Sequence, residues 1–507
     1  MKEVITLQFG EQANYAGTHY WNLMHAATSE DADASLALET LYCECNEQLD
    51  SAQTRKIQLS APRLLAYDRA GNYASRGEDS NANDNDNNNN NGVDVDVDVD
   101  VDVEYSSGRE KRDKGNGRVA QGVEAAWNGQ NIEIHRQHQR RKTSLAAAAS
   151  ESGIRYWTDY SDLRYHPRTL NSVSGLEFGS SLGEMNTFIE GQRVFVGEDS
   201  REEVLEGRFR AFAEECDLIQ GFQVLADAYG GFAGYASAYL QRVREEYPKS
   251  PIVLYSVCAG CEDSMGTAQQ TDVSVAVATA LGQEVSMSVP LFAPPRLDRP
   301  DLGVSLDFGS QFQTSAFAAA NVAQWSYSLL ARSRTMDEVV DQATHQGFYR
   351  IAESLLAPRL EISGDSASTR SSVSDLVRDR FVACSSVRVD SIESLAGQLF
   401  VDRGTAVTRL VADMLPRSAY VDNGRAVALP KAFPSIFGGP QRAESGKLAS
   451  VGVAGLLCST SGSEARLQRL HSSLKTEQSR HLKDYERDDI RELRYALDSC
   501  IDRYSSI

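Results

Sequence analysis

Apolar residues in the first half of the chain occur in short runs that end in polar or glycine-rich segments. Runs of this length are typical of parallel strands covered by helices on both faces. Four of them predict buried strands: EVITLQF (3–9), PRLLAYD (62–68), LIQGFQVLA (218–226) and SPIVLYSV (250–257). The last two enclose a glycine-rich loop and a helical segment. The order strand, loop, helix, strand predicts a doubly wound α/β domain.

A helical period of apolar positions predicts two amphipathic helices. The first follows the glycine-rich loop and ends at Pro248, with the apolar stripe Ala236, Tyr239, Leu240, Val243 and Tyr247. We expect that stripe to pack on the sheet. The second lies in the charged C-terminal tail, with the stripe Ile490, Leu493, Leu497, Ile501 and Tyr504. We expect it to dock on the body of the protein, with docking on a partner as the alternative.

The strand and helix patterns stop after Gly71. Residues 81–104 read NANDNDNNNNNGVDVDVDVDVDVE, and aspartates on one face of an alternating strand would repel one another. We therefore expect 77–150 to be a disordered insertion in a first domain that spans 1–270. Short apolar runs with proline-rich breaks predict a second α/β domain over 271–460. A helical segment over 461–507 completes the chain.

Composition and charge narrow the classes of function. The chain has 507 residues, enough for two or three domains, and its net charge of −20 disfavours nucleic acid as a direct partner. The basic stretch HRQHQRRK (135–142) leaves a nuclear-localisation or nucleic-acid patch as a weaker alternative. Glu3 and Glu11 interrupt the apolar N-terminal stretch, and no apolar run approaches the ~20 residues of a membrane span. We expect neither a presequence nor a transmembrane segment.

Candidate metal ligands and nucleophiles are sparse. Cys258 and Cys261 have CxxC spacing, but no second CxxC or histidine pair completes a zinc site. We expect ordinary reduced thiols there. His166 precedes Pro167 with no nucleophile or acid nearby in the sequence, which favours a structural role. We predict no metal site and no catalytic residue.

Two stretches match one known family in the same order. KEVITLQFGEQANYAGTHYWN (2–22) resembles the first strand, phosphate loop and first helix of tubulin. The second stretch resembles the tubulin strand, signature loop and following helix. It consists of CDLIQGFQ (216–223), the glycine loop (229–235) and REEYP (244–248). Four segments more closely resemble the Misato family of tubulin-related proteins. They are the start of the chain, the EECD block at 214–217, the HPR block at 157–168 and the P-FP-IF run at 430–437.

That resemblance implies a tubulin-like α/β fold: a doubly wound nucleotide-binding-type domain, a second α/β domain and C-terminal helices. It also implies where a nucleotide would lie, since the matching loop positions are Gly10, Glu11, Gln12, Asn14, Gly230, Gly231 and Gly234. Phosphate loops bind through backbone amides that glycines leave accessible. Here Phe232 interrupts the glycine run, and Glu11 places a carboxylate where polyphosphate would lie. We predict a degenerate site without a cofactor. GTP binding, with Glu11 as a magnesium ligand, is the alternative.

The parts of tubulin-like GTPases that hydrolyse GTP and recognise its base are also not identifiable. The segment VTRLVADMLPRSAYV (407–421) lacks an Asn-x-Asp pattern, and QTSAFAAANVAQ (313–324) shows no base-recognising helix. The family resemblance implies a non-enzymatic role in mitochondrial partitioning, mitochondrial morphology and mitochondrial DNA inheritance. The expected locations are the cytosolic face of the mitochondrial outer membrane and the cytoplasm. Expected partners are tubulin or other cytoskeletal subunits, chaperonin or outer-membrane proteins. The alternative is an active GTPase that assembles head to tail.

Overall fold

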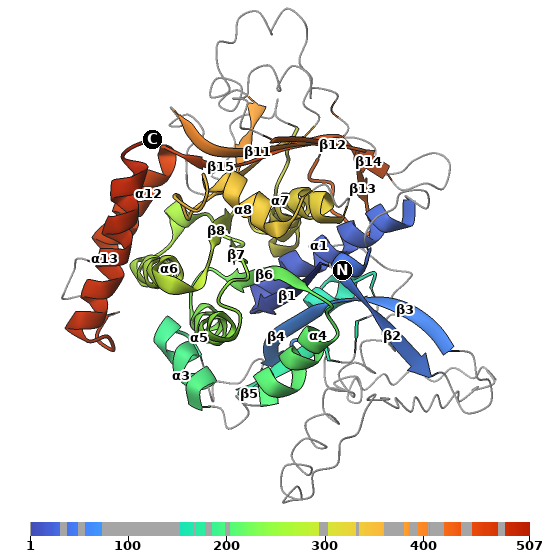
Figure 1. Ribbon diagram of the computed structural model, residues 1–507, viewed down its shortest axis with the longest axis horizontal. Coiled ribbons are helices and arrows are strands. Elements are labelled where there is room, and N and C mark those ends of the chain that lie inside the picture. Colours follow the sequence, from blue (N-terminus) through green and yellow to red (C-terminus); the bar gives the residue numbers. More distant parts are fainter. Residues whose placement is uncertain are drawn as a thin grey trace, which may run out of the picture.

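The computed structural model describes most of the chain outside the predicted insertion (Figure 1). The predicted insertion at 77–150 and most of the 407–421 segment lie outside the described residues. The ranges that the structure describes are 2–30, 38–48, 56–73, 153–163, 165–166, 168–177, 185–197, 203–293, 303–330, 334–358, 380–384, 394–403, 405, 420–437, 449–474 and 482–507.

A six-stranded parallel sheet forms the centre of the N-terminal half, in the order β5-β4-β1-β6-β7-β8. Its strands are β1 (Glu3–Phe9), β4 (Leu64–Ala70), β5 (Leu170–Glu177), β6 (Ile219–Asp227), β7 (Ile252–Cys258) and β8 (Met287–Phe292). The four strands predicted from apolar runs are confirmed as β1, β4, β6 and β7. Because β8 pairs with β7, the sheet extends beyond the predicted domain boundary at residue 270.

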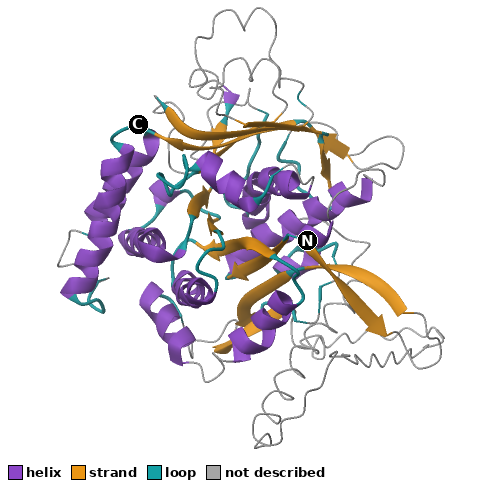
Figure 2. Cartoon of the chain, viewed as in Figure 1, coloured by secondary structure: helices purple, strands orange, loops and turns teal. Residues whose placement is uncertain are grey.

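Helices cover both faces of this sheet, as Figure 2 shows. On one face, Ile5, Leu7 and Phe9 of β1 pack in one cluster with the stripe of α5, whereas Val4 belongs to the cluster that contains α1 and α7. Alternate β1 side chains therefore enter opposite cores. The helices of this half are α1 (Glu11–Glu30), α3 (Phe188–Gly197), α4 (Arg210–Glu214), α5 (Gly231–Glu246) and α6 (Thr267–Thr279), with shorter turns η1 (Leu38–Thr40), η4 (Trp157–Tyr160), η5 (Glu203–Phe209), η6 (Glu262–Ser264) and η7 (Ala280–Glu284).

A second, mixed sheet has five strands in the order β10-β9-β15-β11-β12. Helix α7 (Gln311–Leu330) is buried along almost its whole length and shares one core with residues from both sheets. The remaining elements are β2 (Tyr42–Gln48), β3 (Lys56–Pro62), α8 (Met336–Ala343), β9 (Glu353–Pro358), β10 (Val382–Ala383), β11 (Leu395–Arg403), β12 (Tyr420–Gly424), β13 (Val427–Leu429), β14 (Ala449–Val451) and β15 (Val453–Thr460).

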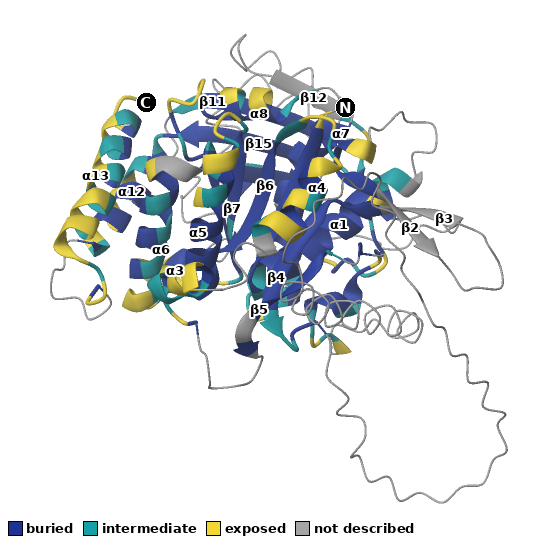
Figure 3. Ribbon diagram, turned by 60° about the horizontal axis from the view of Figure 1, so that its bottom comes forward, coloured by how far each residue is buried: buried dark blue, intermediate teal, exposed yellow. Residues whose placement is uncertain are grey.

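The C-terminal helices α12 (Gly462–Ser473) and α13 (Arg487–Tyr504) pack on each other and on α6, and the outer side of α13 is exposed in Figure 3. Leu497 and Tyr504 are buried, and the Tyr504 hydroxyl accepts a hydrogen bond from the Ile351 backbone N–H at 2.9 Å. The predicted docking of this stripe on the body of the protein is confirmed. None of the helices in the described ranges combines the length and apolar character that crossing a membrane requires.

Candidate functional site: the pocket at the carboxyl edge of the parallel sheet

A pocket of about 400 Å³ lies where β1, β4, β6 and β7 end. Ligands of doubly wound proteins bind at this edge, because the loops that follow neighbouring parallel strands meet there. The lining side chains are largely polar or charged, and we call this cavity the sheet-edge pocket: Glu11, Gln12, Asp68, Arg69, Met185, Asn186, Asp227, Tyr229, Gly230, Gly231, Phe232, Ala259, Gly260 and Gln311.

The turn from β1 into α1 is tightly packed against the end of β6. Gly10 has a φ of 95°, and a Cβ built on it would lie 2.4 Å from the carboxyl carbon of Asp227. The backbone N–H of Ala13, in the first turn of α1, donates to Oδ1 of Asp227 at 2.8 Å. The first N–H groups of a helix are the donors that bind phosphate in this fold class. One of them is therefore engaged by a carboxylate of the protein itself.

The second loop is shorter in the structure than the glycine run predicts. Helix α5 begins at Gly231, so Tyr229 and Gly230 alone separate it from Ala228 after β6. Gly230 has a φ of 77°, the left-handed region that glycine favours. Its backbone N–H, like that of Phe188, forms a hydrogen bond that lowers the pKa of Asp272 on α6. The carboxylate of Asp272 therefore also faces an amide of the predicted phosphate loop.

Two of the loop glycines serve helix packing. A Cβ on Gly231 would lie 2.4 Å from the Met185 carbonyl oxygen, and one on Gly234 would lie 1.8 Å from the Phe188 carbonyl oxygen. On the facing helix, a Cβ on Gly191 would lie 1.7 Å from the Gly231 carbonyl oxygen. The three glycines let the backbones of α3 and α5 approach closely, so the motif retains a packing role.

The electrostatics of the sheet-edge pocket oppose an anion. Burial raises the pKa of Asp227 well above its usual value, and the charges of Asp68 and Glu11 raise it further. Burial and the nearby Asp68 likewise raise the pKa of Glu11, although Arg69 lowers it. The arrangement concentrates carboxyl groups with one lining cation, so each group resists ionisation.

Asp68 differs from its neighbours because its carboxylate is surrounded by donors. Oδ2 accepts hydrogen bonds from Asn14 Nδ2 at 3.0 Å, Asn72 Nδ2 at 3.0 Å and Trp157 Nε1 at 2.9 Å. Oδ1 accepts from its neighbour's backbone, the Arg69 N–H, at 2.8 Å. Burial still raises the pKa of Asp68, while these bonds lower it. Asp68 therefore fastens β4 to α1 and to the η4 turn.

Magnesium–nucleotide does not fit these residues as they are arranged. In the part of the chain that the structure describes, no group of three or more His, Cys, Asp or Glu side chains has the geometry to hold a metal ion. A polyphosphate would face Glu11, Asp68 and Asp227 together. At the two helix starts, the Ala13 and Gly230 amides bind carboxylates of the chain.

Comparison with known proteins shows which families this chain resembles. Residues 2–149 match the Misato Segment II tubulin-like domain, and residues 146–332 match the tubulin domain. Protein DML1 of Gibberella zeae is 27% identical over 334 residues, which cover 64% of this chain and 59% of that protein. Protein misato homolog 1 of Pongo pygmaeus is 25% identical over 268 residues, covering 51% and 46%. The chain is therefore similar to the Misato family and to tubulin.

These matches confirm the predicted tubulin-like fold. A further relative, protein dml1 of Aspergillus clavatus, is 26% identical over 330 residues, covering 63% of this chain and 58% of that protein. The chain thus spans about three fifths of the length of these fungal relatives.

The structure brings most of the predicted site residues together. Glu11, Gln12, Gly230 and Gly231 line the sheet-edge pocket, and Gln12 Oε1 accepts the Ala259 backbone N–H at 2.8 Å. Gly10 and Asn14 lie behind it, against Asp227 and Asp68. Gly234 lies one turn into α5, against α3. That these positions form a degenerate nucleotide site stays a prediction.

Sequence reasoning missed the charged residues contributed by other elements: Asp68, Arg69, Asp227 and Asp272. Asp68 and Asp227 lie at or near the carboxyl ends of β4 and β6. An aspartate at the carboxyl end of a parallel strand could have indicated these two site residues, because ligands of doubly wound folds bind at that edge. Asp272 could not be found this way, because it reaches the loop from α6.

The remaining candidates have structural environments. His166 is buried edge-on to Phe212, and its Nδ1 accepts the Arg168 backbone N–H at 3.2 Å. Cys258 and Cys261 are free thiols, and burial raises the pKa of Cys258 to about 12. The 313–324 segment lies in the buried helix α7, where Asn321 bonds to Phe317 and Ser354.

Proposed function

We propose that this chain is a tubulin-shaped protein that does not hydrolyse GTP. In this proposal it acts in partitioning mitochondria, in mitochondrial morphology and in mitochondrial DNA inheritance, as an adaptor or assembly factor. The observation that carries the non-enzymatic part is the Asp227 carboxylate on the Ala13 N–H. The mitochondrial part is supported by the similarity of the chain to the Misato family.

The charge of the sheet-edge pocket supports the loss of hydrolysis. GTPase chemistry depends on cations and amides that stabilise charge spread over the transferred phosphoryl group. Glu11, Asp68 and Asp227 place carboxyl groups at that edge instead. Arg69 is a cation in the lining; its charge lowers the pKa of Glu11, and the pKa of Asp227 is lowered by the Ala13 hydrogen bond and then by Arg69.

The rival function is a GTPase that assembles head to tail, and the retained position of the pocket favours it. Isothermal titration calorimetry with magnesium–GTP at high micromolar concentration separates the two, together with phosphate release at rising protein concentration. We expect neither saturable heat nor turnover. Tight, magnesium-dependent binding would contradict our proposal, and turnover that rises with protein concentration would establish the rival.

A variant comparison tests whether the pocket matters in cells. Cells that lack their own copy would receive the wild-type chain or the Glu11→Gln variant, and the distribution of mitochondria would be scored. We expect equal rescue, because the proposal assigns the work to surfaces outside the pocket. Loss of rescue by a variant that still folds, as judged by its melting temperature, would show that the pocket is functional.

The proposed partners are tubulin or other cytoskeletal subunits, chaperonin and mitochondrial outer-membrane proteins. Proximity labelling from this chain, compared with labelling from an untargeted enzyme at the same abundance, would rank these three groups. An adaptor at the cytosolic face predicts enrichment of outer-membrane proteins together with cytoskeletal or chaperonin subunits. Labelling confined to the mitochondrial matrix would contradict the proposed location.

A further inference from the structure

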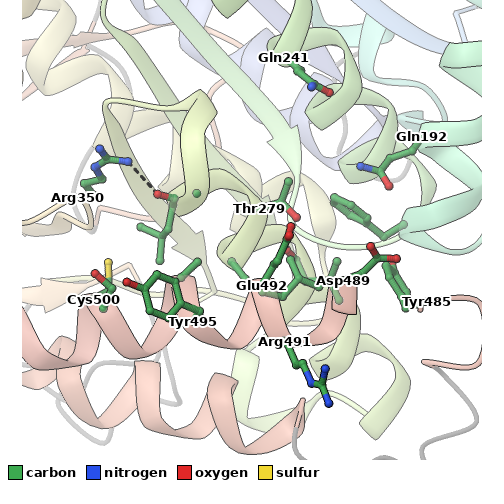
Figure 4. A pocket seen from close by; sticks show the side chains of 18 of the residues that line it. Gln192, Gln241, Thr279, Arg350, Tyr485, Asp489, Arg491, Glu492, Tyr495 and Cys500 are labelled. Atoms are coloured by element: carbon green, nitrogen blue, oxygen red, sulfur yellow. Dashed lines mark hydrogen bonds between the residues drawn. The ribbon is translucent and has the colours of Figure 1, made fainter. Parts of the chain in front are cut away.

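A second, larger cavity of about 1050 Å³ runs between α13 and the layer formed by α3, α5 and α6 (Figure 4). We call it the α13 groove. It is separate from the sheet-edge pocket, so an inference drawn from it does not depend on whether nucleotide binds. The apolar residues of its lining, which we call its floor, include Phe188, Val275 and Leu493.

The two ends of the α13 groove carry opposite charge. Arg350 and Cys500 lie at one end in Figure 4, while Asp489 and Tyr485 lie towards the other. Arg503 belongs to the first end, because it and Arg350 both act on the pKa of Cys500. The acidic end also contains Glu492, whose side chain is exposed, and Arg491, which forms an ion pair with Asp488 at 2.8 Å.

The two arginines at the basic end bind carbonyl oxygens and leave charge uncompensated. Arg350 Nη1 donates to the Leu281 carbonyl at 2.8 Å, and Arg503 Nη1 donates to the Phe348 carbonyl at 3.2 Å. Among the residues that the structure describes, neither guanidinium forms an ion pair with a carboxylate. A guanidinium has five N–H donors, so each retains donors for an incoming acceptor.

The other end contains a polar group without a partner. The hydroxyl of Tyr485 is buried and has no hydrogen-bond partner within the described residues. A buried hydroxyl left unpaired costs about 1–3 kcal/mol.

The length of the groove sets the size of an extended occupant. Asp489 and Arg503 are separated by fourteen residues of one α-helix, which corresponds to about 21 Å. At about 3.4 Å per residue, an extended segment of about six residues spans this distance.

We propose that the α13 groove binds an extended segment of about six residues from a partner protein. The segment carries an acidic side chain or a terminal carboxylate at the Arg350–Arg503 end and a basic side chain at the Asp489–Glu492 end. Apolar side chains between them contact the floor of the groove. Gln192, Gln241 and Ser499, which also line it, are placed to bond the backbone of the segment.

The test is a selection from a random hexapeptide library displayed on phage, with the full chain as bait. We expect enriched sequences to carry an acidic and a basic residue at opposite ends. Synthetic copies, labelled with fluorescein, would then be titrated by fluorescence anisotropy against the wild-type chain and its Arg503→Glu variant. We expect at least tenfold weaker binding to the variant. Exchanging the acidic residue of the peptide for lysine should restore the affinity.

Two further variants keep the experiment decisive. Glu492→Lys changes an exposed side chain at the acidic end of the groove, and we expect the affinity for the peptide to fall. Exchanging the basic residue of the peptide for an acidic one should restore that affinity. Arg487→Glu, on the same helix but outside the groove lining, should leave affinity unchanged. The proposal is overturned if no charge-paired sequence is enriched, or if the selected peptides bind Arg503→Glu and Glu492→Lys as tightly as wild type.

Discussion

The carboxylate of Asp227 accepts the backbone N–H of Ala13 at 2.8 Å, so the end of β6 is bonded to the first turn of α1. In a doubly wound fold this is where an anion meets a helix N-terminus. The carboxyl oxygen of Asp227 accepts one of the first N–H donors of the helix without a ligand. The same contact holds the turn from β1 into α1 against the end of β6.

We predict that Asp227→Asn stabilises the protein at neutral pH. The amide oxygen can still accept the Ala13 N–H, but the buried charge is removed. Because the pKa of Asp227 is raised in the folded protein, its protonated carboxyl group favours the folded state. This contribution to stability is complete below the unfolded pKa and is lost as pH rises through the folded pKa. Urea denaturation should show a gain above about 1 kcal/mol at pH 7 that shrinks towards pH 4. Equal losses at both pH values would contradict this explanation.

Asp68→Asn should have the opposite effect. The Asp68 carboxylate accepts three side-chain donors on Oδ2 and one backbone donor on Oδ1. An amide nitrogen in either position would face a donor, leaving buried groups unpaired at about 1–3 kcal/mol. Urea denaturation at pH 7 should therefore rank Asp227→Asn above wild type and Asp68→Asn below it. The reverse ranking would show that charge repulsion outweighs hydrogen bonding at Asp68.

Asp272 should make the stability of the protein depend on pH within a range that is easily measured. Burial raises its pKa to about 6, the hydrogen bonds from Gly230 and Phe188 lower it, and the charge of Glu190 raises it. Its contribution to stability is complete below about pH 4 and falls as pH rises to about 6. Asp272→Asn should flatten the stability profile between those values, as measured by urea denaturation. A profile that the substitution leaves unchanged would place the titration elsewhere.

The sequence predicted the parallel strands well, because β1, β4, β6 and β7 are apolar runs of typical length. It also placed Glu11 and Gly230 near one site. What it could not show was that Asp227 and Ala13, 214 positions apart, form a hydrogen bond. Nor could it reveal that Gly234 packs on α3, since a helix crossing and a phosphate loop both favour glycine. The charge of the pocket depends on such long-range placement.

Gly234→Ala tests the packing role of the loop glycines. A methyl group there would lie 1.8 Å from the Phe188 carbonyl oxygen, so α3 must move away from α5. We expect a loss of about 1–3 kcal/mol, because overpacking shifts a backbone that cannot yield locally. Gly197→Ala at the end of α3 is the matched control, since nothing lies within 4 Å of its added Cβ. Similar melting temperatures for the two variants would refute the close crossing.

Two ion pairs between the same elements provide the last comparison. Arg466 of α12 binds Glu262 of η6 through Nε at 3.0 Å, and both side chains are buried. One turn away, Arg469 binds Asp263 at 2.7 Å, and that pair is largely exposed. Removing one partner of a buried pair leaves an uncompensated charge, so Arg466→Met should cost about 3–5 kcal/mol.

Arg469→Met should cost about 1 kcal/mol or less, because water screens the exposed pair. Adding Glu262→Gln to Arg466→Met should recover part of the loss, since it removes the charge left unpaired. Urea denaturation of the four proteins at low and high salt measures these differences, and salt should affect the exposed pair more. Equal costs for Arg466→Met and Arg469→Met would mean that burial does not set the strength of this junction between α12 and the first domain.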